Sequence, residues 1–418
     1  EEEKSSPGQE AEKIGVQDVD PGVCRSYRQI RVDCYSTHMR YEIGPIRPPN
    51  EAYSLLVRFT RNCPWNQCAF CRVYKGKKFE KRPVNKIKED IDIIRGIRDD
   101  AVALSWKKGY AGSVNDDLID LIFSTPSYNE FYKNVAMWLY FGGKNVFIQD
   151  ANSLAMKPED FIEALTYLKE TFPSIDRVTS YARSRTIAKR LTVENLTCMR
   201  NAGLTRLHVG METGSDFLLN YIKKGVTKQE NILCGKKVKE AGIELSEYVV
   251  LGLGGKKWWE EHAAETADAL NKINPDFIRF RTLKVLKDMP LYQKVESGDF
   301  VIQHEEEILI EEKLLIEKLE GITSSIKSDH ILNLLEEVDG KLPEDKERIL
   351  SVIETYLSLN KEQRLVYRFG RRAGMYRSTD DLQDELTYLR IRKTINEIEQ
   401  KEPGSVEKTL SLLLENYI

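Results

Sequence analysis

Cysteine is scarce in this sequence and occurs seven times in 418 residues. The number is odd, and the first residues are acidic and polar, unlike a secretory signal peptide. Both observations argue against a disulfide framework, which is typical of small secreted domains. We therefore expect a protein of a reducing cytoplasm, whose cysteines are free or bound to metal.

The sequence also lacks an excess of charge of either sign and a long apolar run. It has 63 Lys and Arg against 66 Asp and Glu, a net charge of −3. This balance predicts no overall basic surface for nucleic acid. No apolar run approaches the ~18 residues of a membrane span. With 41% hydrophobic and 31% charged residues, the composition is typical of globular proteins.

The cysteines that are present include three close together, Cys63, Cys68 and Cys71, in the spacing C-x4-C-x2-C. They follow a strand-like run, Tyr53–Phe59. Thiolates are the ligands that iron–sulfur clusters and zinc prefer. A closed zinc site needs four ligands, but no Cys or His follows Cys71 until Cys198. The loop therefore predicts a four-iron cluster with one open iron. A zinc site completed from afar and a trio without metal are the alternatives.

Six strand-like segments follow one another along the chain, with helical sequence between them. They are Tyr53–Phe59, Val146–Gln149, Arg177–Tyr181, Leu204–Met211, Ile243–Leu251 and Phe277–Val285. Such alternation predicts an α/β fold with a parallel sheet covered by helices. Ligands of these folds lie at the carboxyl ends of the strands. The residues expected there are polar or glycine: Thr60, Asp150, Ser180, Glu212 and Gly252.

The sequence predicts three regions. Residues 1–48 form an N-terminal arm and connector, residues 49–300 the β/α region, and residues 301–418 a helical C-terminal region. Helices are expected at Glu305–Leu319 and at His330–Val338, with Asp329 as the N-cap of the second. Cys24, Cys34 and His38 precede the β/α region. They are a poor ligand set for a second cluster, so free or buried thiols are expected.

A strand, a three-cysteine loop and repeated β/α units together are similar to the radical S-adenosylmethionine (radical SAM) superfamily. The resemblance covers roughly residues 50–290. It implies a partial (β/α)6 barrel and a [4Fe–4S] cluster held by Cys63, Cys68 and Cys71. It also implies that SAM binds the open iron and is cleaved to a 5′-deoxyadenosyl radical. The commonest spacing in the superfamily is C-x3-C-x2-C, and the longer first gap here resembles minority branches.

A second motif, Val-Gly-Met-Glu-Thr-Gly-Ser-Asp at residues 209–216, resembles G-x-E-[ST]-G-[SN] of one branch. That branch includes the anaerobic coproporphyrinogen oxidases, the methylthiotransferases and the Elongator catalytic subunit. The resemblance implies that Glu212 accepts hydrogen bonds from the SAM ribose. A buried salt bridge is the alternative for this carboxylate.

Further SAM contacts are implied by position. Asp150 and Asn152 stand where the family has an acidic motif that holds the SAM amino group, although the usual Gly-Gly-Glu-Pro is absent. Both could instead cap a helix or form an Asx-turn. Phe70 is expected beside adenine, with loop packing as the alternative. The remaining candidates are Ser180, Arg183 and Lys224, of which the two cations could hold the SAM carboxylate or be ordinary surface charges, and Gly252 beside adenine.

Four residues of the expected strands are candidate substrate contacts at the barrel mouth: Tyr181, Tyr248, Arg279 and Arg281. His330 is a candidate proton-transfer group. The arginines of Arg364–Arg377 mimic an RNA-contact patch, for which a solvated basic helix end is the alternative. Glu305–Glu307, Glu311 and Glu312 would repel phosphates beside the mouth.

We therefore expect an anaerobic enzyme whose small-molecule substrate is enclosed by the barrel and the C-terminal helices. A flavodoxin-like or ferredoxin-like donor would supply low-potential electrons, and no nucleic acid or membrane partner is expected. No Asp-x-His-x-x-Gly pattern for cobalamin is present. Two rival functions stay open. One is radical SAM modification of tRNA or a protein side chain, and the other is a zinc-dependent or non-catalytic α/β binding protein.

Overall fold

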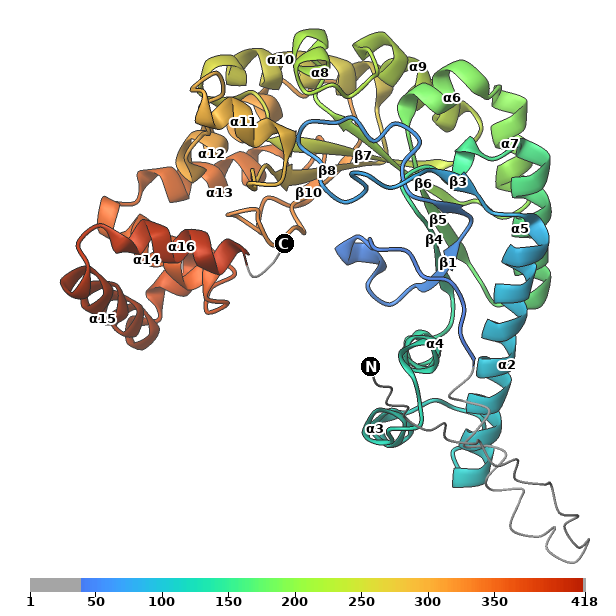
Figure 1. Ribbon diagram of the computed structural model, residues 1–418. Coiled ribbons are helices and arrows are strands. Elements are labelled where there is room, and N and C mark those ends of the chain that lie inside the picture. Colours follow the sequence, from blue (N-terminus) through green and yellow to red (C-terminus); the bar gives the residue numbers. More distant parts are fainter. Residues whose placement is uncertain (1–38, 416–418) are drawn as a thin grey trace, which may run out of the picture.

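A computed structural model describes residues 39–415 of the chain (Figure 1). The second group of candidate ligands, Cys24, Cys34 and His38, lies outside the described residues. No helix within the described part of the chain combines the length and the apolar character that crossing a membrane requires.

A curved sheet of parallel strands forms the centre of the molecule, as the alternating pattern predicts. Its first six strands are neighbours in chain order and all pair in parallel. They are β1 (Leu55–Arg58), β4 (Asn145–Gln149), β5 (Arg177–Ala182), β6 (Arg206–Glu212), β7 (Glu244–Leu251) and β8 (Phe277–Thr282). Each coincides with a strand expected from the sequence. An open sheet of this order, with helices outside it, is a partial (β/α)6 barrel.

Two further strands extend this sheet after residue 300 and were not expected from the sequence. β9 (Ser325–Lys327) pairs in parallel with β8, and β10 (Gly340–Lys341) pairs with β9 in the antiparallel direction. Both are too short to show a period-2 pattern. The C-terminal region is therefore continuous with the barrel through its sheet.

Helices line the convex side of the sheet, as Figure 1 shows. The first, α2 (Val84–Lys108), buries Ile87, Ile91, Ile94 and Ile97 on one face and ends at Gly109, which adopts the left-handed conformation. The other helices up to α12 are α3 (Asp116–Ser124), α4 (Glu130–Tyr140), α5 (Pro158–Thr171), α6 (Ser184–Arg190), α7 (Val193–Asn201), α8 (Asp216–Tyr221), α9 (Lys228–Glu240), α10 (Gly255–Ile273), α11 (Pro290–Glu296) and α12 (Glu305–Glu317). Of these, α3 and α4 lie below the β1 end of the sheet and not along its convex side (Figure 1).

The two faces of the sheet differ in character because side chains alternate along each strand. The outer face contributes apolar residues to the main core under the helices, among them Val146, Val209 and Phe280. The inner face carries aromatic and charged side chains, among them Tyr248 and Arg279. This polarity of the concave face is what an enclosed polar ligand requires.

Four helices form the C-terminal end of the molecule: α13 (Lys346–Ser358), α14 (Lys361–Arg372), α15 (Glu385–Lys401) and α16 (Ser405–Glu415). The prediction of a helix at His330–Val338 is wrong, because this segment consists of turns. Asp329 does not cap a helix there. Its carboxylate binds Arg279 and Arg281 of β8 instead.

Three arginines of the basic stretch Arg364–Arg377 are buried and paired, so they form neither an RNA patch nor a solvated helix end, whereas Arg377 is exposed. The side chains of Arg368, Arg371 and Arg372 are 7%, 6% and 2% exposed. Their partners are glutamates of the same region, chiefly Glu305 and Glu407. Glu305 is therefore neutralised too, and it cannot repel a phosphate at the barrel mouth.

Candidate functional site

The three-cysteine loop begins at the carboxyl end of the first strand. Thr60–Arg61 (β2) and Glu80–Lys81 (β3) pair as a short antiparallel ribbon and close the loop at its base. Cys63, Cys68 and Cys71 are free and part-exposed. Burial raises the pKa of the Cys68 thiol, and the cations Lys224 and Arg183 oppose this rise.

The cluster that the sequence predicts at the three thiols stays a prediction. All three lie on one loop, and the other described cysteines lie elsewhere, Cys198 on α7 and Cys234 in the core under α9. Among residues 39–415, no three His, Cys, Asp or Glu side chains are already grouped as a metal site.

The loop is anchored on the turn after α8. The Trp65 indole donates a hydrogen bond of 2.7 Å to the carbonyl oxygen of Lys223. Its ring lies against Gly225, where an added Cβ would come within 2.3 Å of the indole. The guanidinium of Arg183 stacks over the same ring at 5.2 Å. A glycine at residue 225 is therefore required for the loop to lie in this position.

A buried ion pair stands beside this loop. The Nζ atom of Lys224 is 2.5 Å from Oε1 of Glu212, and it also lies 5.8 Å from the Phe70 ring. Burial alone would lower the pKa of Lys224, but the charge of Glu212 outweighs it and holds that pKa above its ordinary value. The lysine carbonyl accepts a hydrogen bond of 2.7 Å from Arg183. Four of the predicted SAM contacts thus come together next to the cysteines.

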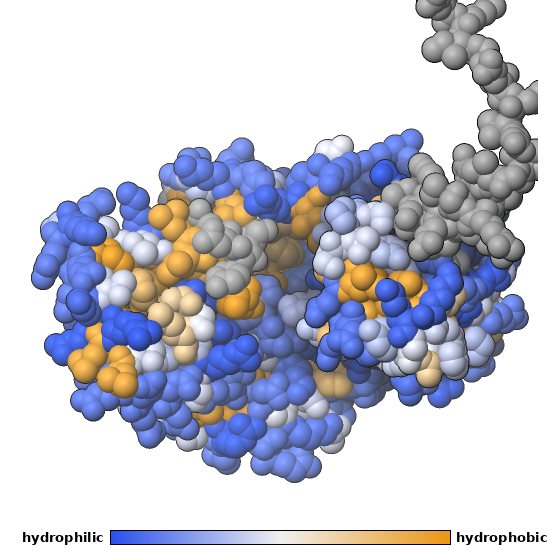
Figure 2. Space-filling view, turned by 90° about the horizontal axis from the view of Figure 1, so that it is seen from below, coloured by the Kyte–Doolittle hydropathy of each residue, from blue (hydrophilic) through white to orange (hydrophobic). Residues whose placement is uncertain are grey.

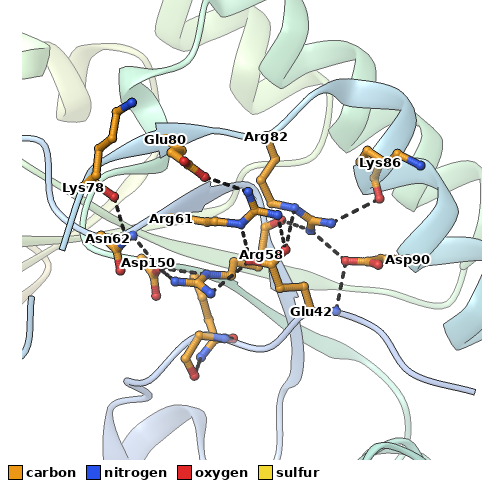
Figure 3. Close-up of polar contacts among 12 residues, drawn as sticks. Glu42, Arg58, Arg61, Asn62, Lys78, Glu80, Arg82, Lys86, Asp90 and Asp150 are labelled. Carbon is orange, nitrogen blue, oxygen red and sulfur yellow. Dashed lines mark hydrogen bonds and ion pairs between the residues drawn. The ribbon is translucent and has the colours of Figure 1, made fainter.

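Asp150 is also at the expected strand end, and it is fully buried (Figure 3). Its Oδ2 atom accepts hydrogen bonds of 2.9 and 2.5 Å from the Arg58 guanidinium and 2.8 Å from the backbone N–H of Asn62. Its Oδ1 atom packs against Gly44, and the charge of Asp150 contributes to raising the pKa of the neighbouring Tyr74 hydroxyl. The carboxylate thus ties β4 to the start of the cysteine loop.

Asn152 and Ser180 are buried and engaged within the protein. The Asn152 amide donates to Thr186 at 2.8 Å, and its oxygen accepts from the backbone N–H of Arg183 at 3.2 Å. The amide therefore ties the turn after β4 to the start of α6, and it makes no cap bond to the helical turn that follows it, which was an alternative from the sequence. The Ser180 hydroxyl lies 3.2 Å from the carbonyl oxygen of Tyr181. Their contact with SAM remains a prediction.

Gly252 begins the loop after β7 and has a φ of +83°. Its N–H donates a hydrogen bond of 2.8 Å to Glu311 of α12. The same carboxylate lies 3.4 Å from His262 of α10, and the other ring nitrogen of His262 lies 2.8 Å from the Thr213 hydroxyl. This buried chain links α12 to the residue that follows Glu212.

His262 and Thr266 were not expected from the sequence; the Thr266 hydroxyl accepts a hydrogen bond of 2.9 Å from the Gly214 N–H. Glu311 was expected to repel phosphates at the barrel mouth, which is wrong, because it is fully buried and burial raises its pKa to about 8. The spacing of His262 and Thr266 in the sequence gives a weak indication that both are buried. His262 and Thr266 are four residues apart on α10, so they share the face that also buries Ala263 and Ala267. Polar residues on an otherwise apolar helix face indicate a buried hydrogen-bond network.

The four candidate substrate contacts, Tyr181, Tyr248, Arg279 and Arg281, do lie on the concave face of the sheet. The Tyr181 and Tyr248 rings are 6.1 Å apart, and Arg281 stacks over Tyr248 at 4.6 Å. His330 lies near by, and burial together with the charge of Arg281 lowers its pKa to about 4.

Comparison with known proteins adds a likeness in sequence and fold. No family model matches the chain. Over 117 residues it is 26% identical to the tRNA uridine(34) acetyltransferase of Methanocaldococcus jannaschii, an alignment that covers 27% of this chain and 21% of that protein. Similar solved structures include OxsB, a cobalamin-dependent S-adenosylmethionine radical enzyme, with 14% identity and a TM-score of 0.42 over 87% of this chain and 58% of OxsB. The chain resembles radical SAM enzymes.

Another similar structure is the archaeal Elp3 of Methanocaldococcus infernus lacking its N-terminal residues. It shares 17% identity and a TM-score of 0.38, over 50% of this chain and 54% of that one. The chain thus spans little more than half the length of the OxsB and Elp3 structures. Its alignment with the acetyltransferase covers about a fifth of that protein.

Proposed function

We propose that the chain is a radical SAM enzyme, in which Cys63, Cys68 and Cys71 hold a [4Fe–4S] cluster and SAM completes its coordination. When bound, such a cluster supplies the electron that cleaves SAM to a 5′-deoxyadenosyl radical, which abstracts hydrogen from a substrate. The observation that carries the proposal is the free three-cysteine loop at the strand ends, next to the Glu212–Lys224 pair. A low-potential flavodoxin-like or ferredoxin-like donor and an anaerobic, cytoplasmic setting belong to this proposal.

The chain's own residues would bind and orient SAM. Glu212 is proposed to accept from the ribose hydroxyls, because carboxylate oxygens suit vicinal hydroxyl donors. Asp150 is proposed to hold the amino group, because its buried carboxylate stands at the strand end beside the cysteine loop. Arg183 suits the carboxylate, since its guanidinium is already held beside Trp65. Phe70 would pack against adenine. Asn152, Ser180 and Gly252 complete the proposed set.

The decisive experiment measures 5′-deoxyadenosine formed from SAM by the anaerobically reconstituted protein with a low-potential reductant. Cys63→Ala, Cys68→Ala and Cys71→Ala should each abolish the product. Cys198→Ala is the matched control, because this exposed cysteine lies on α7, away from the loop, and it should keep full activity. Product from any of the loop variants would refute the cluster assignment.

Metal content separates this proposal from the zinc-dependent rival. A [4Fe–4S] cluster requires about four irons per chain, whereas a structural zinc site requires one zinc. One zinc and no iron after anaerobic purification would favour the rival.

We further propose that the substrate is a small molecule held at the concave face of the sheet. The buried, paired arginines of α14 support this, because they leave no basic patch there for RNA. The similarity to a tRNA-modifying relative favours tRNA as the second candidate. A titration with bulk tRNA distinguishes them, since tight binding that weakens steeply with salt would favour tRNA.

The proposed regions remain residues 1–48, 49–300 and 301–418. In this division the C-terminal region covers one end of the barrel. Figure 1 shows its helices beside that end, and the β8–β9 pairing joins the two regions.

A further inference from the structure

Aromatic side chains form a continuous group on the concave face of the sheet. The His208 ring meets the Tyr248 ring edge-on, with 5.3 Å between their centroids. Tyr181 lies 5.7 Å from His208, and Phe147 lies 5.1 Å from Tyr181. These rings come from four neighbouring strands, β4 to β7. Phe147 and His208 are fully buried, so they support the rings of Tyr181 and Tyr248, against which an apolar group can pack.

Two arginines border this aromatic surface and share one carboxylate. The Nη1 atom of Arg279 lies 2.5 Å from Asp329, and that of Arg281 lies 2.9 Å from it. Arg279 also donates to the Ser246 hydroxyl at 3.1 Å. Two guanidinium groups against one carboxylate leave one positive charge that this cluster does not neutralise.

The neighbouring ionisable groups do not remove that charge. Glu51 is paired with Arg177 at 3.2 Å. Burial lowers the pKa of His208 to about 4, so this ring is neutral at pH 7. Burial raises the pKa of Tyr248, which stays protonated. The net charge near the arginines is therefore close to +1.

Two nitrogen atoms of this surface are buried without a hydrogen-bond partner in residues 39–415, Nη2 of Arg281 and Nδ1 of His208. A buried polar nitrogen without a partner is unfavourable, so it marks a place where a ligand atom or water can bind. The Arg281 side chain is 13% exposed and that of Asp329 is 29% exposed. Figure 2 shows a hollow between two lobes of the molecule on this side.

We propose that this surface binds the carboxylate group of the substrate, with Arg281 donating from Nη2 and the rings of Tyr248 and Tyr181 packing against the substrate's apolar part. The inference rests on the proposed function, of which it names the substrate class. A carboxylate fits better than a phosphate, because its single negative charge matches the single unneutralised positive charge. Asp329 would also repel a dianion more strongly.

The test uses the full chain without reductant and benzoate as the probe, since benzoate combines one carboxylate with one apolar ring. Ligand-observed NMR titration should show benzoate binding, and benzamide, its uncharged analogue, should bind about tenfold or more weakly. Inorganic phosphate should not displace benzoate at equal concentration. Displacement by phosphate, or equal binding of benzamide, would overturn the proposal.

Single substitutions test whether Arg281 binds the carboxylate of benzoate. Arg281→Gln should weaken benzoate binding about tenfold to hundredfold, as expected for a lost charged hydrogen bond. Arg95→Gln is the matched control, because Arg95 is exposed on α2, and its affinity should equal that of the parent. If Arg281→Gln does not fold, Arg281→Lys serves in its place, because lysine keeps the charge but lacks the planar fork. Unchanged affinity in a folded variant would refute the assignment.

This assay is independent of SAM cleavage. Benzoate binding that depends on Arg281, in a protein that forms no 5′-deoxyadenosine, would support the carboxylate site and contradict the proposed reaction. Formation of 5′-deoxyadenosine without such binding would contradict the carboxylate site alone.

Discussion

The Nζ atom of Lys224 lies 2.5 Å from Oε1 of Glu212, and the side chains of both residues are 11% exposed. A buried ion pair gains little net stability over an apolar pair, because both ions lose their hydration. Its place beside the cysteine loop and Phe70 therefore indicates more than a stabilising role. In the proposed function, Lys224 fixes the Glu212 carboxylate in position for the ribose of SAM.

Replacing Glu212 by Gln tests that role. The amide keeps the shape of the side chain but loses the charge, so SAM should bind more weakly by about 1–3 kcal/mol while iron content is unchanged. Glu244→Gln is the control, since Glu244 pairs with Arg206 at the opposite end of the sheet. Equilibrium dialysis with labelled SAM measures both, and parental affinity in folded Glu212→Gln would exclude the ribose contact.

Gly225 should be essential for the position of the cysteine loop. A Cβ at this residue would meet the Trp65 indole at 2.3 Å, and the residue has a φ of +71°. Gly225→Ala should therefore displace Trp65 and reduce the iron bound after reconstitution. Gly298→Ala has a similar φ of +76° but open space around its Cβ, so it should cost only the backbone strain, about 1 kcal/mol, and keep the iron. Equal iron in the two variants would contradict this role of Trp65.

Glu312 should make the protein less stable as pH rises. It is 3% exposed, and burial and the neighbouring Glu311 raise its pKa to about 8. Below its ordinary pKa it is protonated in both states. Between that pKa and pH 8 only the unfolded chain ionises, so folding stability is lost across this window. The Glu312→Gln variant cannot ionise at this residue and does not lose stability in this way. Its free energy of unfolding relative to the parent protein should therefore rise by a few kcal/mol between pH 4.5 and pH 8.5.

Urea denaturation at pH 4.5 and pH 8.5 measures the free energy of unfolding of the variant and the parent. The control is Glu354→Gln, because the Glu354 side chain is 59% exposed, and it should change this free energy by the same amount at both pH values. A Glu312→Gln variant whose advantage does not grow with pH would show that Glu312 is ionised in the folded protein.

Glu305 should have the opposite pH dependence. Burial would raise its pKa, but the charges of Arg372 and Arg368 outweigh this and lower the pKa to about 2. Its contribution to stability is thus present above the ordinary pKa of glutamate and is lost as pH falls through 2. Glu305→Gln leaves the buried arginines short of a partner and should cost about 3–5 kcal/mol at pH 7.

Thermal denaturation at pH 7 and pH 3 measures the stability that Glu305→Gln loses relative to the parent protein, and this loss should be smaller at pH 3. Glu306→Gln is the matched neighbour, because Glu306 is 29% exposed and has a single 3.2 Å contact with Arg364. It should cost no more than about 1 kcal/mol. Equal costs for the two variants would contradict a special role of the Glu305 cluster.

The amino-acid sequence by itself determined the six strands and the position of the cysteine loop. Strand residues such as those of Ile243–Leu251 and helix residues such as Ile87, Ile91 and Ile94 follow local periods, and a local period needs no knowledge of distant contacts. The ligand set of Cys63, Cys68 and Cys71 is local for the same reason. The strand ends then predicted which residues share one edge of the sheet, and Glu212, Arg183 and Phe70 do lie together there.

Only the tertiary structure decided which charges are neutralised. Arg368 and Arg372 belong to a basic stretch in the sequence, but Glu305, more than sixty residues away, pairs with both of them. Asp329 has the local pattern of a helix cap, yet Arg279 and Arg281 bind it from β8. An ion pair between distant residues has no period and no fixed spacing, so its partner is set by how the helices and strands pack. The unneutralised charge of Arg281, on which the carboxylate site depends, is visible only after that packing is known.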